Sequence, residues 1–173
     1  MAEAAAKGVS SVAGVNASLI PILGEHIQNG RYQNEAALKQ LDESEGILFG
    51  SPTYMGGPAA QFKAFADATA GRWFAGAWRN KIAGGFTVSS SPSGDKFSTL
   101  QYFFTLAMQH GMIWVGLGEM PLQPNGVNHL GAYSGAMARA GQESPDVAPA
   151  IGDLRTVEIL GARLAGLILK TAT

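Results

Sequence analysis

Short apolar runs alternate with segments of helical length along this chain. Four runs are predicted to be strands, at residues 15–23, 47–50, 81–88 and 112–117. The last three are nearly continuous in apolar residues, which is typical of strands buried on both faces of a sheet. The first is interrupted by Pro21 near its end. Residues 24–33 are polar and are predicted to form a loop.

The segments between these runs have the character of helices. Helices are predicted at residues 1–11, 35–41, 58–69, 98–109 and 149–170. Pro58 suits the first turn of a helix, and Gly71 and Gly111 are predicted to end helices. In the last segment, aliphatic side chains recur near the helical spacing, at Leu154, Val157, Leu160, Leu164, Leu167 and Ile168.

This alternation predicts one α/β domain over residues 1–173, with a doubly wound parallel sheet. Ligands of such folds bind beyond the carboxyl ends of the strands. Two loops are predicted to leave strand ends there, at residues 51–58 and 89–95. Residues 118–148 are too many for a bare connection, so this stretch is expected to be functional or to carry an added hairpin.

Both loops have residues suited to a flat, polar ligand. In the first, Gly56 and Gly57 allow backbone amides to come close to a ligand, and Tyr54 could stack on one. The second is rich in serine, and its exposed amides could donate hydrogen bonds to ring carbonyl groups or to an anion. A glycine-rich connector and a solvated turn are the alternative interpretations from composition alone.

Composition and charge exclude several classes of function. The formal net charge is −1, which argues against a broad surface for nucleic acid, and no apolar run reaches the roughly 18 residues of a membrane span. Charged residues make up 14% of the chain, below the usual share of about 25%, which suggests that another subunit covers part of the surface. No signal peptide is evident, so a cytoplasmic protein is expected.

The sequence contains none of the common motifs for metal or nucleophilic catalysis. It has no cysteine, and its three histidines, His26, His110 and His129, are far apart and lack zinc-site spacing. A nucleophile elbow, a phosphate-binding P-loop and a dinucleotide fingerprint are also missing. We therefore expect no metal site and assign no catalytic side chain.

Several motifs occur in the order found in a known family. They read GSPTYMGG from Gly50, QFKAFAD from Gln61, WFAGA from Trp73, AMQHGM from Ala107 and GAYSGA from Gly131. Over about residues 1–170 the chain resembles the WrbA-type NAD(P)H:quinone oxidoreductases, which are flavodoxin-like FMN proteins. The resemblance implies a three-layer α/β/α fold with FMN at the two loops.

The resemblance also implies roles for individual residues. Thr53, Tyr54 and Met55 would line the isoalloxazine ring, largely through backbone groups. The serine-rich loop would hold the polar edge of the ring and the ribityl chain, through Val88, Ser89, Ser90, Ser91, Pro92, Ser93 and Gly94. Trp73 would bind substrate by stacking on the quinone or the nicotinamide. His110, or its neighbour Gln109, would stand near the flavin.

The chain departs from this family at its beginning. Family members begin with a central strand and a Ser/Thr/Gly loop that holds the FMN phosphate, whereas Met1-Ala2-Glu3-Ala4 matches the middle of the first helix. The resemblance therefore implies a sheet that lacks its first strand, about 15–20 residues with its loop. That strand would lie between the predicted strands at 15–23 and 47–50. A chain of this length is expected to bind FMN less tightly.

The function implied is two-electron reduction of quinones by NADH or NADPH, with hydride transfer through FMN. Because the family forms tetramers, a homo-oligomer, dimer or tetramer, is expected. Two alternatives remain from the sequence. One is a flavodoxin-like module with impaired FMN binding and no catalytic activity, and the other is a flavodoxin-type electron carrier. Such carriers are usually strongly acidic, which the net charge of −1 does not match.

Overall fold

The computed structural model describes residues 1–171 of the chain. Its helices and strands follow in this order: α1 (Ala2–Ser10), the 3-10 turn η1 (Gly24–His26), β1 (Ile27–Gln28), β2 (Arg31–Tyr32), α2 (Glu35–Glu43), β3 (Gly46–Tyr54), β4 (Gly57–Pro58), α3 (Ala60–Ala68), α4 (Ala70–Ala75), β5 (Ile82–Ser89), α5 (Lys96–Gln109), β6 (Ile113–Trp114), β7 (Ala136–Arg139) and α6 (Ile151–Thr171). β1 and β2 form a small separate hairpin.

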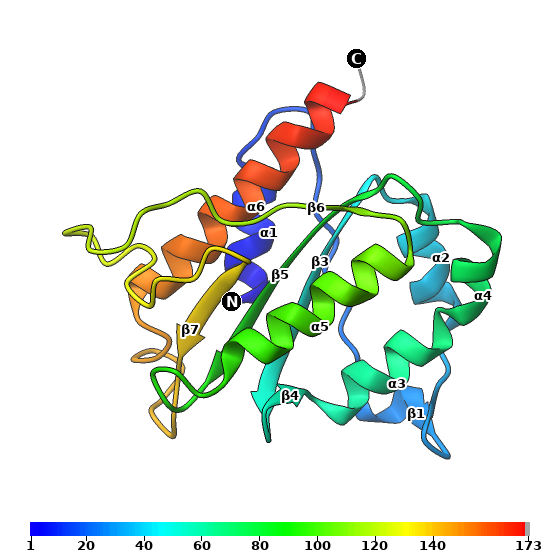
Figure 1. The fold of residues 1–173 in the computed structure, drawn as a ribbon, viewed down its shortest axis with the longest axis horizontal. Coiled ribbons are helices and arrows are strands. Elements are labelled where there is room, and N and C mark those ends of the chain that lie inside the picture. Colours follow the sequence, from blue (N-terminus) through cyan, green and yellow to red (C-terminus); the bar gives the residue numbers. More distant parts are fainter. Residues whose placement is uncertain (172–173) are drawn as a thin grey trace.

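A parallel sheet built around β5 organises the chain (Figure 1). β5 pairs with β3 on one side, and the short β4 adds antiparallel pairing at the end of β3. On its other side, β5 pairs with β6 near its start and with β7 near its end. β6 and β7 are therefore two pieces of one edge strand, interrupted by residues 115–135. This sheet confirms the predicted α/β fold.

Helices cover both faces of the sheet, in three layers (Figure 1). Successive residues of a strand point to opposite faces. In β3, Leu48 packs with the cluster under α1 and α6, whereas Phe49 packs with the cluster under α5 and α3. The second cluster is rich in aromatic rings and includes Phe62, Phe65, Trp78 and Phe103. Two cores thus hold the sheet from its two sides.

Glycine allows α1 and α6 to pack unusually closely. A Cβ atom on Gly161 would lie 2.4 Å from the carbonyl oxygen of Ala5, and one on Gly8 would lie 1.9 Å from that of Glu158. Neither position can hold a larger residue without separating the helices. Because α6 also covers β3, β5 and β7, this contact ties α1 to the sheet.

All five predicted helices are confirmed with ends within two residues, but Pro58 does not open the third of them. Pro58 lies in β4, and α3 begins at Ala60. Gly71 does not end a helix, because α4 runs through it and ends at Gly76, which adopts the left-handed conformation at φ +66°. Sequence alone placed the stop at the wrong glycine.

Three segments differ in structure from the predicted strands and loops. The strand at 112–117 shortens to β6, because the amide of Leu117 donates to the carbonyl of Tyr133 rather than to β5. The stretch 118–148 carries β7, a strand of the main sheet, instead of an added hairpin. The predicted loop at 24–33 contains η1 and the β1–β2 hairpin.

The predicted strand at 15–23 is absent. No regular structure occurs there, although Ile22 packs against the aromatic core. A strand requires a neighbour whose backbone completes its hydrogen bonds. Within residues 1–171, no strand pairs with 15–23, and none pairs with β3 along 46–52 on the side away from β5. The structure therefore has a flavodoxin-like sheet without a first strand, as predicted.

Membrane-spanning helices and metal-binding groups are both absent from the part of the chain that the structure describes. Within residues 1–171, every helix is too short or too polar to span a bilayer. In the same part of the chain, no three His, Asp or Glu side chains form a group that could hold a metal ion.

Candidate functional site

The two predicted loops lie next to each other at the carboxyl ends of β3 and β5. The strands are parallel and in register there, with Pro52 opposite Val88. Ser98, in the first turn of α5, connects the loops, because its hydroxyl lies 2.6 Å from the carbonyl oxygen of Gly56 and also contacts that of Asp95. The fold thus brings together residues that are about 35 positions apart, as parallel strands require.

The first loop presents two side chains to solvent and turns a third inward. Thr53 is buried, and its hydroxyl lies 2.8 Å from that of Thr87 and 2.7 Å from that of Thr99. Tyr54 and Met55 are exposed, and Met55 adopts a left-handed conformation at φ +47°. Thr53 can therefore meet a ligand only through its backbone, whereas the side chains of Tyr54 and Met55 are free to cover one.

The carbonyl groups of the serine loop, residues 89–94, are hydrogen-bonded into the protein. From β7, the amide of Ala140 donates to Ser89 O at 3.1 Å, and Arg139 Nε donates to Ser90 O at 3.1 Å. From α5, Lys96 Nζ donates to the carbonyl oxygens of Ser91 at 2.7 Å and Pro92 at 3.0 Å, and the backbone amide of Lys96 donates to Ser93 O at 3.2 Å. All five consecutive carbonyls are satisfied.

This arrangement turns amides of the serine loop outward. In a trans peptide, the C=O group and the following N–H group point in opposite directions. Since each carbonyl is bonded within the protein, the N–H groups that follow point away from those bonding partners, at Ser90, Ser91, Ser93 and Gly94. Among residues 1–171, no hydrogen bond uses these four amides as donors. The loop therefore offers a row of donors to a ligand with acceptor atoms.

Gly94 is required for this loop conformation. Its φ is +54°, in the region that favours glycine, and a Cβ atom there would lie 2.1 Å from Ser89 Oγ. Ser89 Oγ is in turn 3.0 Å from Lys96 Nζ. A side chain at Gly94 would therefore disturb both ends of the loop.

Buried charges lie behind the serine loop. Lys96 is fully buried, and burial lowers the pKa of its amine. Burial raises the pKa of Asp153, and this is opposed by a hydrogen bond from the Arg139 amide at 3.0 Å and by the charges of His129 and Lys96. His129 Nδ1 lies 3.2 Å from Asp153 Oδ1. The half-exposed ring of His129 lines a cavity of about 560 Å³ beside the loop.

α4, which carries Trp73, and the C-terminal end of α5, which His110 follows, lie at the opposite end of the sheet from the serine loop (Figure 1). His110 follows the last turn of α5, whereas the serine loop precedes the first turn. The 14 residues of this helix span about 21 Å. His110 and Trp73 instead line a second cavity, of about 570 Å³, with Phe74 and Arg79. Within one chain, they cannot contact a flavin that the serine loop holds.

His110 has the environment of a core histidine. Its ring packs on that of Trp78, with centroids 4.4 Å apart, and it is 4% exposed. The Thr69 hydroxyl donates to Ala66 O at 2.7 Å, so at 2.8 Å it accepts from His110 Nε2. Nδ1 then carries the lone pair and has no partner within residues 1–171. Burial lowers the pKa of this imidazole, so His110 is neutral at pH 7.

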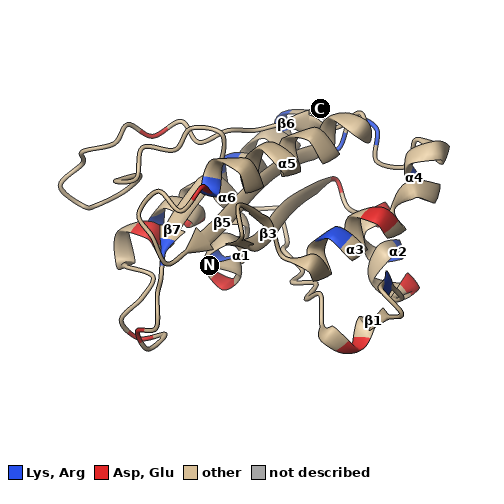
Figure 2. Ribbon diagram, turned by 60° about the horizontal axis from the view of Figure 1, so that its bottom comes forward, with Lys and Arg blue, Asp and Glu red and all other residues tan. Residues whose placement is uncertain are grey.

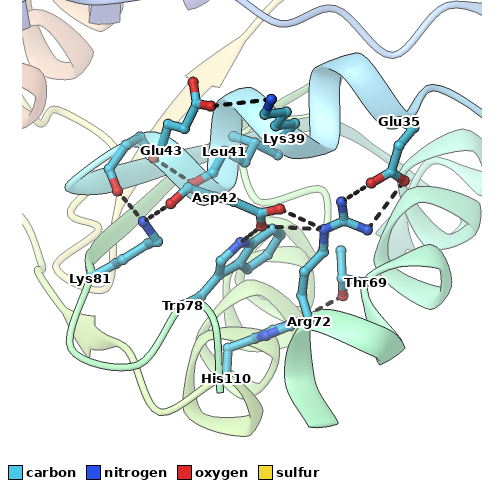
Figure 3. Close-up of polar contacts among 11 residues, drawn as sticks. Glu35, Lys39, Leu41, Asp42, Glu43, Thr69, Arg72, Trp78, Lys81 and His110 are labelled. Carbon is cyan, nitrogen blue, oxygen red and sulfur yellow. Dashed lines mark hydrogen bonds and ion pairs between the residues drawn. The ribbon is translucent and has the colours of Figure 1, made fainter. Parts of the chain in front are cut away.

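A polar cluster holds α4, the helix that carries Trp73, against α2 (Figure 3). Asp42 Oδ1 accepts from the indole N–H of the fully buried Trp78 at 2.8 Å. The other carboxylate oxygen of Asp42 lies 3.1 Å from Arg72 Nε, and the Arg72 guanidinium also pairs with Glu35. These contacts hold α4 in place, and its Trp73 is half-exposed and lines the second cavity.

Sequence reasoning missed the residues that support the serine loop. Lys96 lies in the first turn of α5, where the helix dipole disfavours a positive charge, but the helix predicted from the sequence began at residue 98 and left it outside. Arg139, Asp153 and His129 carried no comparable signal, because their relation to the loop depends on the position of β7 and α6.

A parallel sheet with polar loops at the carboxyl ends of its central strands defines a flavodoxin-like α/β protein. The model of the NADPH-dependent FMN reductase family matches residues 2–123. The chain therefore belongs to this family, and its predicted resemblance to WrbA-type proteins is confirmed. It is an oxidoreductase whose family uses FMN and NAD(P)H.

Similar proteins carry two kinds of name. Flavodoxin FldP of Pseudomonas aeruginosa (strain UCBPP-PA14) is 44% identical over 170 residues, which cover 95% of this chain and 86% of that protein. An NAD(P)H dehydrogenase (quinone) of Geobacter sulfurreducens is 31% identical over 185 residues, covering 98% and 91%. The crystal structure of a flavodoxin, WrbA-like protein from Agrobacterium tumefaciens matches with a TM-score of 0.76 and 39% identity, covering 97% and 87%.

Proposed function

We propose that this protein reduces quinones by two electrons at the expense of NADH or NADPH, with FMN as its cofactor. The observation that carries the proposal is the row of outward amides at Ser90, Ser91, Ser93 and Gly94 beside the exposed loop of Tyr54. The pyrimidine edge of an isoalloxazine ring carries one N–H donor and three acceptors, namely two carbonyl oxygens and a ring nitrogen. These acceptors suit a row of N–H donors, so the residues present fit the ring of FMN.

The residues of the two loops bind and orient the ring in this proposal. Backbone groups of Thr53, Val88 and the serine loop hold the edge of the ring. The side chains of Tyr54 and Met55 cover the ring and exclude water. When bound, FMN would take two electrons from the nicotinamide and pass them to the quinone. The protein's part is then to position the two substrates in turn on the ring. No side chain is assigned as a nucleophile or a base.

We also propose that the protein acts as a dimer or tetramer. Figure 2 shows α5 nearly free of charged residues. It carries a single one, Lys96, and exposes Phe97, Phe104 and Met108. Exposed apolar surface of this kind is typical of subunit contacts. The resemblance implies that Trp73 stacks on a substrate and that His110 stands near a flavin. Either contact would require a second copy of the chain, whose Trp73 or His110 reaches the flavin held by the first. We expect the assembly, built from one domain over residues 1–173, to act in the cytoplasm.

One alternative function is favoured by a specific observation. The relative that is 44% identical is named a flavodoxin, which agrees with an electron carrier, one of the two alternatives that the sequence leaves open. A carrier would exchange electrons with a protein partner and would have no need for an open site at which a nicotinamide and a quinone bind in turn.

Turnover with small substrates separates the two functions. The protein is saturated with FMN, mixed with NADPH or NADH, and assayed for reduction of a benzoquinone. We expect quinone-dependent oxidation of the nicotinamide, well above that of free FMN at the same concentration. An FMN-loaded protein that gives only the rate of free FMN would contradict the proposal and favour the carrier. Light scattering of the same sample tests the oligomer, and a monomer would contradict that part.

A further inference from the structure

Lys96 is a fully buried lysine that the proposed function has not yet used. It is the first residue of α5, and its side chain turns back beneath the serine loop. Its ammonium group donates to Ser89 Oγ at 3.0 Å, Ser91 O at 2.7 Å and Pro92 O at 3.0 Å. No other side chain among the described residues makes as many contacts with this loop.

The three acceptors indicate that the amine is protonated. An ammonium group has three N–H donors, and each finds one oxygen. The Ser89 hydroxyl donates to Ser91 O at 3.3 Å, so all three oxygens can only accept from Lys96, and a neutral amine would direct its lone pair at one of them. No carboxylate within residues 1–171 forms an ion pair with Lys96. Asp153 is the acidic group whose charge acts on it, and that carboxylate is engaged by His129 and the Arg139 amide. A buried positive charge therefore remains behind the loop.

The orientation of the outward amides depends on this lysine. Pro92 has no N–H group, so the peptide that follows Ser91 cannot offer a donor, and Lys96 holds the carbonyl of that peptide and of the next one. The amide of Ser93 is turned outward as a result. Because the charge of Lys96 lies behind these donors, it strengthens any site there for an electron-rich ligand.

We propose that Lys96 is a positioning residue for the flavin: it holds the serine loop with its amides outward, and its charge favours the reduced over the oxidised ring. The inference rests on the proposed function and deepens it. It assigns two measurable properties to one side chain that does not touch the ligand, namely the affinity for FMN and the preference between the two redox forms.

The test compares Lys96→Met with wild type and with Lys39→Met. Lys39 lies on α2, with 74% of its side chain exposed, so it controls for the loss of a lysine. FMN affinity is measured by quenching of flavin fluorescence, and the midpoint potential of bound FMN by titration with a redox dye. Hydrogen exchange is measured without flavin at the two backbone amides that donate to carbonyl groups of the serine loop, those of residue 96 and Ala140, and it reports the order of the loop independently of binding.

For Lys96→Met we expect FMN affinity to fall about tenfold and hydrogen exchange of the residue 96 and Ala140 amides to accelerate. For Lys39→Met we expect both quantities to equal those of wild type. We also expect the ratio of affinities for reduced and oxidised FMN to fall about tenfold, as a more negative potential. Affinity within twofold of wild type and unchanged exchange would overturn the proposal. Weaker binding with an unchanged ratio would overturn the role of the charge.

Two further outcomes are kept distinct. If wild type itself does not bind FMN, the proposed function fails, and the exchange measurement still decides whether Lys96 orders the loop. If Lys96→Met does not fold, Ser89→Ala removes one of the three acceptors and leaves the lysine in place. Faster exchange of the Lys96 and Ala140 amides in Ser89→Ala supports the role of Lys96, and unchanged exchange of both overturns it.

Discussion

Replacement of Gly94 by alanine tests the geometry of the serine loop most sharply. An alanine at φ +54° costs about 1–2 kcal/mol of backbone strain. Its Cβ atom would also stand 2.1 Å from Ser89 Oγ, so the hydroxyl must move away and lose its contact with Lys96. Loss of a hydrogen bond to a charged donor lowers the unfolding free energy by a further amount of about 1.5–3 kcal/mol. We expect FMN affinity to fall at least about tenfold.

Gly30→Ala provides the matched control. Gly30 has a similar φ of +75°, but a Cβ atom there meets nothing within 4 Å, and the residue lies in the β1–β2 turn. In urea titrations Gly30→Ala is expected to lose about 1–2 kcal/mol of unfolding free energy from backbone strain alone, and Gly94→Ala about 2.5–5 kcal/mol because the lost hydrogen bond adds to the strain. Only Gly94→Ala should lose FMN affinity in fluorescence titrations. Equal FMN affinities in the two variants would refute the reasoning.

The remaining predictions concern stability. Gly161→Ala forces α1 from α6 and is expected to cost about 2–4 kcal/mol in chemical denaturation, whereas Gly166→Ala, which meets no neighbour within 4 Å, is expected to gain about 0.5–1 kcal/mol; similar values would contradict the packing of these helices. Asp42→Ala leaves the buried indole N–H of Trp78 without a partner and is expected to cost about 2–4 kcal/mol, against less than about 0.5 kcal/mol for the exposed Glu43→Ala. Because burial lowers the pKa of His110, the unfolded state binds more protons below its ordinary value of 6.5, so stability is fully present above that pH and is lost as pH falls below it. Melting temperatures at several pH values check this, and the loss should shrink in His110→Gln.

Much of the fold could be predicted because its elements are locally encoded. The buried strand β5 and the long helices α5 and α6 have continuous or periodic apolar patterns that need no tertiary information. The failures occur where a partner decides. Residues 15–23 have the composition of a strand, but no described strand lies beside them to complete its hydrogen bonds. β7 was missed because its four residues become a strand only by pairing with the end of β5.

The candidate site was predictable in part for the same reason. Loops after parallel strands meet at one edge of the sheet, so the proximity of Thr53 to the serine loop follows from topology alone. The inward direction of the Thr53 hydroxyl depends on two other buried threonines, which no local pattern reveals. The resemblance placed His110 near the flavin, but the length of α5 puts it at the opposite end of the sheet from the serine loop of the same chain.

The central claim is that the outward amides of the serine loop hold the edge of FMN. Titration of the ¹⁵N-labelled protein with FMN, followed by amide NMR spectra, tests it most directly. The account predicts that the amide signals of Ser90, Ser91, Ser93 and Gly94 shift most, together with those of Tyr54 and Met55, while that of Gly30 stays in place. Binding of FMN that leaves the four serine-loop amides unmoved would contradict it.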